Sequence, residues 1–117
     1  MAGRQRHQYR HLPAFILLAL ARGPIHGGAI NSVLAERMPH FTPDSGAVYR
    51  TLQQLERDGE VVAQWDTEGH GPARKLYRLT DAGWERLDYW REDIERRVAN
   101  LQHFLTLYQA VRSSGRH

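Results

Sequence analysis

The sequence predicts a mainly α-helical domain with one small β-hairpin, followed by a single long helix. Three segments within residues 12–59 carry apolar side chains at the spacing of buried or amphipathic helices. After Gly59 the pattern changes to two short runs rich in β-branched and aromatic residues, separated by a glycine-rich turn. From residue 81 to about residue 112 the chain has no proline, which favours one uninterrupted helix.

Length and composition bound what this chain can be. Its 117 residues suffice for one compact domain and one appended element, and 41% hydrophobic against 25% charged residues is typical of a folded globular protein. The absence of cysteine excludes disulfides, a thiolate nucleophile and cysteine-ligated metal sites. The longest apolar run, residues 14–21, is too short to span a bilayer and precedes no signal-peptide cleavage pattern. We therefore expect a cytoplasmic protein without a membrane partner.

The distribution of charge points to a polyanionic partner. The net charge is +3 and the sequence pI is near 9.7. Residues 1–78 hold ten Arg and Lys against seven Asp and Glu, whereas residues 79–117 hold six of each. Because the whole basic excess lies in the first two thirds of the chain, this part is the one expected to meet nucleic acid.

Proline, glycine and composition predict the first elements. Residues 1–11 are basic and almost free of apolar side chains, so we expect a flexible arm. Pro13 suits the first turn of an apolar helix over residues 14–21, and Gly23-Pro24 ends this helix. An amphipathic second helix is predicted over residues 26–38.

A third helix begins among four candidate capping residues, Thr42-Pro43-Asp44-Ser45, and ends at Gly59. Its apolar stripe, Val48, Leu52 and Leu55, is predicted to be buried. Its other face combines hydroxyl, amide and guanidinium groups, which are suited to contacts with DNA: Ser45, Tyr49, Arg50, Gln53, Gln54 and Arg57.

The predicted hairpin consists of residues 60–66 and 74–79 around Gly69-His70-Gly71-Pro72. Its second strand begins with two cations, Arg74 and Lys75, and His70 lies at its tip. We assign all three to DNA contacts, with a solvated hairpin edge as the alternative for the two cations. Thr80 is the predicted cap of the final helix.

The final helix, residues 81–112, is about 45 Å long at 1.5 Å per residue, which is more than a domain of this size can cover. Its apolar residues recur at alternating steps of three and four, as in a coiled coil. We therefore predict a homodimer paired through Leu87, Ile94, Val98, Leu101, Leu105 and Tyr108. Residues 113–117 are expected to form a disordered tail.

Three short helices, a hairpin and a long helix are the order of a winged helix-turn-helix with a dimerising extension. Residues 12–80 would form the DNA-binding domain and residues 81–112 the pairing helix. In such a dimer two copies of the third helix read a pseudo-palindromic double-stranded DNA site, with half-sites about 34 Å apart.

Three blocks of sequence resemble the PadR family of transcription regulators: residues 16–27, 46–59 and 71–83. The length resembles the short branch of that family, whose members end in a single C-terminal helix. The resemblance implies transcription regulation rather than enzymatic activity. This chain departs from the family pattern at Gly28 and Ala29, where a tyrosine and an acidic residue are usual, and at Gln54, where a basic residue is frequent.

Clustered aromatic residues suggest where an effector would bind. The resemblance implies small aromatic or planar effectors for some relatives, and Trp65, Tyr89 and Trp90 are the candidate walls of such a site. The alternative is that these aromatics only pack in the core and the dimer. We predict neither a cofactor nor a metal: His7 and His11 have a chelating spacing, but no acidic residue stands near them. No catalytic motif is present in the sequence.

The leading prediction is thus a dimeric repressor released by a small aromatic effector. An architectural DNA-binding protein without an effector would share the same motifs, and so would an adaptor that uses the winged helix to bind protein. A ligand pocket at the dimer axis would separate the first of these from the second.

Overall fold

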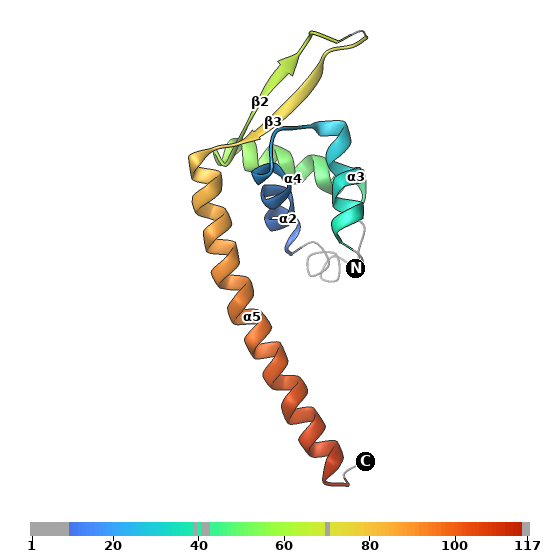
Figure 1. Ribbon diagram of the computed structural model, residues 1–117, viewed down its shortest axis with the longest axis vertical. Helices are drawn as coiled ribbons and strands as arrows, with labels where there is room; N and C mark the ends of the chain where they lie inside the picture. The colour runs from blue at the N-terminus through green and yellow to red at the C-terminus, as the bar shows by residue number, and fades with distance from the viewer. Residues whose placement is uncertain (1–9, 39, 41–42, 70, 116–117) are drawn as a thin grey trace. The chain divides into compact units, whose positions relative to one another are not determined.

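The structure is a computed structural model that describes residues 10–38, 40, 43–69 and 71–115. Most of the predicted basic arm, His7 included, and His70 lie outside these ranges. The chain divides into two units, residues 1–87 and 88–117, which we describe separately. The elements of the first unit are α2 (Leu12–Ala21), β1 (Ile25–His26), α3 (Gly27–Arg37), α4 (Ser45–Arg57), β2 (Val61–Asp66), β3 (Arg74–Leu79) and the start of α5 (Asp81–Ser113) (Figure 1).

The core of the first unit is built around α2. This helix is apolar on almost every side, and it begins at Leu12 with Pro13 in its first turn. Leu18 is its one large apolar side chain on the surface, 47% exposed. Helices α3 and α4 and the sheet cover the rest of α2 and contribute further buried apolar side chains, among them Ile30, Leu34, Val48, Leu52, Leu55, Val61 and Tyr77. The predicted burial of the first helix is confirmed.

Helix α4 has well-defined ends. The Asp44 carboxylate accepts a hydrogen bond of 2.7 Å from the backbone N–H of Ala47, which makes Asp44 the cap among the four candidates. At the other end Gly59 has a φ of +74°, a left-handed conformation that glycine adopts at little cost. Both ends agree with the sequence prediction.

The sheet has three antiparallel strands in the order β1-β3-β2. The hairpin register places Trp65 opposite Lys75 and Asp66 opposite Arg74. Figure 1 shows the β2–β3 hairpin extending beyond α3 and α4, as the wing of a winged helix does. Strand β1 was not predicted, because two residues are too few to show a periodic pattern.

A compact corner joins the base of the hairpin to the first turn of α5. The Thr80 hydroxyl donates to the carbonyl of Gly59 at 2.6 Å and accepts from the backbone N–H of Gly83 at 3.0 Å. The Thr80 N–H donates to the Glu60 carbonyl at 3.2 Å. A Cβ atom at Gly83 would overlap that same carbonyl oxygen, so only glycine fits there. Thr80 therefore caps α5, as predicted, and its hydrogen bonds also close the base of the hairpin.

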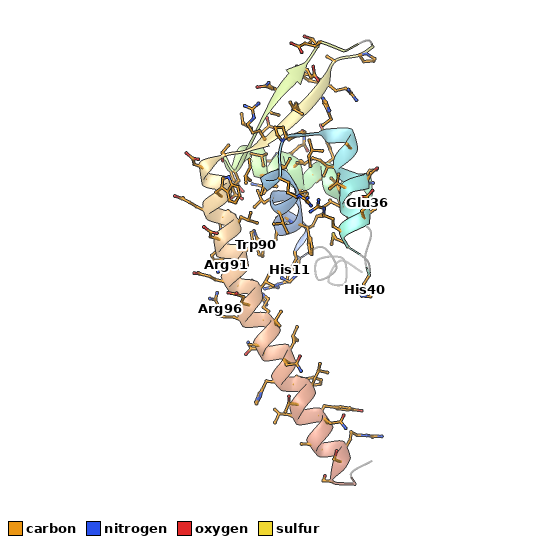
Figure 2. All side chains as sticks on the ribbon, viewed as in Figure 1. His11, Glu36, His40, Trp90, Arg91 and Arg96 are labelled. Carbon is orange, nitrogen blue, oxygen red and sulfur yellow. The ribbon has the colours of Figure 1, made fainter. Side chains whose placement is uncertain are left out.

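The second unit is the remainder of α5, which ends at Ser113, one residue beyond the predicted end. Side chains project from all sides of this helix (Figure 2). Asp93 accepts a hydrogen bond of 2.8 Å from Arg97, and the rings of Phe104 and Tyr108 stack at 6.4 Å. Several large apolar side chains are more than half exposed: Val98, Leu101, Phe104, Leu105, Leu107, Tyr108 and Val111. Across the described ranges, no helix is both long and apolar enough to cross a membrane.

Candidate nucleic-acid interface

The polar face of α4 is exposed because the opposite face of the helix supplies the core. Tyr49 is 56% exposed and Arg50 is exposed beside it, whereas Gln53 is half-buried. The Arg50 guanidinium lies beside Gly46, one turn earlier in the helix. Ser45 is exposed at the first position of α4. The hydroxyl, guanidinium and amide groups predicted to meet DNA are thus brought together on one surface.

The last turn of this face is already hydrogen-bonded. Arg57 donates to the side-chain oxygen of Gln54 at 2.7 Å, and the Gln54 amide donates to Asp58 at 2.9 Å. The side-chain oxygen and nitrogen of Gln54 are both hydrogen-bonded, so Gln54 would have to break one of these hydrogen bonds to contact a base edge. Arg50 and Gln53 are therefore better placed for base contacts than Gln54.

The two cations of the wing have different surroundings. Arg74 is exposed. Lys75 is half-exposed, and its ammonium group lies 3.6 Å from the Glu56 carboxylate of α4. The same ammonium lies 5.9 Å from the centre of the Trp65 ring and 5.8 Å from that of Tyr77, which are cation–π distances. Lys75 faces α4, whereas Arg74 faces solvent.

A side-chain hydrogen bond connects β1 with the wing. His26 Nε2 lies 2.9 Å from Asp66 Oδ2, at the end of β2. The hydrogen bond with His26 holds the pKa of the Asp66 carboxyl below its ordinary value. This contact could not be predicted from the sequence, because its partners are 40 residues apart and belong to no common motif.

The three aromatic residues predicted to bind an effector do not lie in one unit. Trp65 lines a cavity of the first unit, together with Tyr49 and Tyr77. Tyr89 and Trp90 belong to the second unit, where their rings form an edge-to-face pair at 6.0 Å. Sequence reasoning missed Tyr77, whose strand partner Ile25 lies in the unpredicted strand β1.

Residues 16–89 match the family model of the PadR-like transcriptional regulators. The chain belongs to this family. The resemblance carried by the three sequence blocks is confirmed, as is the winged-helix fold with a long C-terminal helix. The PadR-like family is one of transcriptional regulators, in agreement with the prediction that the chain is not an enzyme.

Several solved structures of transcriptional regulators are similar to this PadR-like chain. Bacillus subtilis PadR, crystallised in complex with operator DNA, shares 28% identity over 70% of this chain with a TM-score of 0.63. The chain spans 47% of the length of that protein, about half. A PadR family regulator from Eggerthella lenta has the same fold, with 24% identity, 89% coverage of both chains and a TM-score of 0.75.

A conserved protein described as a potential transcriptional factor shares 34% identity with this PadR-like chain. The alignment covers 85% of this chain and 90% of that one, with a TM-score of 0.65. Among curated proteins, no sequence matches significantly.

Proposed function

We propose that this PadR-like protein binds a pseudo-palindromic DNA site as a homodimer and represses transcription until a small aromatic effector releases it. The observation that carries the proposal is the exposed polar face of α4 next to a wing with an exposed arginine. In winged helices such a face enters the major groove while the wing follows the backbone.

The chemistry of the two surfaces supports a division of labour. Arg50 and Gln53 offer paired hydrogen-bond donors and acceptors, which discriminate base edges in the major groove. Ser45, Tyr49 and Arg74 offer hydroxyl groups and a cation, which suit phosphates. The Bacillus subtilis relative was crystallised with operator DNA, which favours the same kind of partner here.

The exposed apolar side chains of α5 support pairing with a second copy of the chain. At 100° per residue, those between Leu101 and Val111 cover an arc of about 160° around the helix. An uncovered apolar stripe of this width is costly in water and is typical of an interface. Two copies of one helix cover each other by symmetry, so a homodimer needs no further partner. Leu87 and Ile94, which are half-buried, would extend this interface toward the winged helix.

The test measures DNA binding by the full chain. Fluorescence anisotropy and footprinting on the promoter of its own gene should give a protected site with two half-sites, and sedimentation should give a dimer. Arg50→Ala should weaken binding to that site about tenfold to a hundredfold and change binding to a random duplex little. Equal affinity for every duplex would favour an architectural protein, and no DNA binding at all would favour an adaptor.

A further inference from the structure

A cavity of ≈ 550 Å³ lies between the start of α3, the exposed face of α4 and the inner side of the wing. This volume falls in the range of small-molecule sites, roughly 300–1,000 Å³. Aromatic rings reach it from three elements: Tyr49 from α4, Trp65 from β2 and Tyr77 from β3. Val48, Leu52 and Ala73 add further apolar wall, which suits a flat apolar ring.

Asn31 brings a polar side chain to this cavity. Its side-chain oxygen is buried and has no hydrogen-bond partner among the residues that the structure describes. A buried acceptor without a donor is unfavourable, so turning the Asn31 amide toward a donor in the cavity would gain more than an ordinary surface hydrogen bond. Asn31 therefore selects ligands that carry an O–H or N–H group.

The room for a ligand comes from the two glycines that begin α3. Gly27 and Gly28 both line the cavity, and a Cβ atom at Gly28 would meet no described atom within 4 Å. A larger side chain at residue 28, such as tyrosine, would occupy this open space. The cavity is thus a consequence of this sequence as well as of the fold.

We propose that this cavity binds a small flat aromatic compound with one hydrogen-bond donor, its ring between the aromatic walls and its donor on Asn31. Four of the lining residues are also proposed DNA contacts: Ser45, Tyr49, Arg74 and Lys75. The ligand and DNA therefore exclude each other directly, and release needs no change in how the long helices pair. This last step rests on the proposed function, whereas the binding site does not.

The binding site is tested by NMR on the ¹⁵N-labelled full chain with 2-naphthol as the probe. 2-Methoxynaphthalene, which keeps the rings but lacks the donor, is the matched compound. The backbone amides of Gly27 and Gly28 and the indole N–H of Trp65 should shift, with 2-naphthol binding roughly fivefold to tenfold more tightly. Asn31→Leu should abolish this difference. Equal binding of the two compounds to the natural chain, or shifts confined to α5, would overturn the proposal.

Two tyrosine variants test the place of the ligand. Gly28→Tyr should fill the cavity and abolish binding of 2-naphthol. Ala29→Tyr places the same side chain on the next, exposed residue of α3, outside the cavity lining, and should bind the probe as the natural chain does. Thermal unfolding checks that both variants fold. If both bind equally well, or lose binding equally while folded, the cavity is not the site.

Competition is measured with a labelled duplex. Saturating 2-naphthol should displace DNA from the natural chain, and the same concentration of 2-methoxynaphthalene, which binds more weakly, should displace less. If the probe occupies the cavity while DNA stays bound, direct exclusion is wrong. If the probe binds and no duplex binds even without it, the proposed function fails while the site stands.

Discussion

Replacing Arg74 with alanine should reduce the salt dependence of DNA binding. Each phosphate contact made by a cation contributes about 0.9 to the slope of log affinity against log salt, because it releases a condensed counterion. A dimer presents Arg74 twice, so the slope should fall by about 1.8. When the salt concentration rises from 50 to 200 mM, the factor by which affinity falls should therefore be about ten times smaller for the variant than for the natural chain.

Lys75→Ala should reduce the slope by less than half as much. Its ammonium already lies 3.6 Å from the Glu56 carboxylate and close to two aromatic rings, so it is partly neutralised before DNA arrives. The two side chains carry the same charge, so the difference in slope between the two variants comes from the surroundings of Arg74 and Lys75.

Fluorescence anisotropy with a 30-base-pair duplex of random sequence suffices, since phosphate contacts do not depend on the operator. Arg37→Ala, an exposed arginine at the far end of α3 from the wing, is the matched control and should leave the slope unchanged. An unchanged slope for Arg74→Ala would remove the wing from the interface. A larger effect at Lys75 than at Arg74 would refute the assignment of their environments.

Three further predictions concern stability and assembly. Gly83→Ala should lower the free energy of unfolding by about 1–3 kcal/mol, because the new methyl group overlaps a backbone carbonyl that cannot move aside. Gly28→Ala places its methyl group in open space and should not lower the free energy of unfolding. Equal urea midpoints for the two variants would contradict this prediction. Glu60 is 8% exposed, and its burial raises the pKa of its carboxyl, an effect that the Arg86 guanidinium 3.4 Å away only partly offsets. The ionised carboxylate therefore destabilises the fold at neutral pH, so Glu60→Gln should have a higher free energy of unfolding than the natural chain at pH 7. In urea titrations this advantage should shrink as the pH falls toward 4.5. A variant that is less stable at pH 7 would mean that the ion pair with Arg86 outweighs the cost of burying the carboxylate. Leu101→Asp should dissociate the dimer in sedimentation and abolish DNA binding together, whereas the same change at Gln102, outside the apolar arc, should do neither; a variant of Leu101 that stays dimeric would exclude α5 as the pairing element.

Local patterns in the sequence were sufficient for most of the fold. The bounds of the two long strands follow from β-branched and aromatic runs, and the caps at Gly59 and Thr80 follow from short-range chemistry. Asp44 was one of four candidates for the cap of α4, and the structure was needed to identify it. Strand β1 could not be predicted in this way. It exists only because Ile25 pairs with Tyr77, a contact between residues far apart in the chain.

The candidate site could be predicted as a surface but not as a set of contacts. The helical spacing of α4 indicates which side chains share a face, and this part needs only the period of the helix. The inward position of Lys75 depends on Glu56 of another element, and the cavity depends on three elements meeting. The periodicity of apolar residues within one element carries no information about contacts between elements.

The hydrogen bonds between Thr80 and the carbonyls of Gly59 and Glu60 hold the two ends of the hairpin together, so the hairpin can be replaced as a unit. They close a segment of about twenty residues at its base, so the chain enters and leaves the wing at nearly one point. Closing a longer loop across the same two ends costs little additional entropy. Wings of other lengths or tip sequences could therefore be grafted between these residues while the corner that starts α5 keeps its geometry.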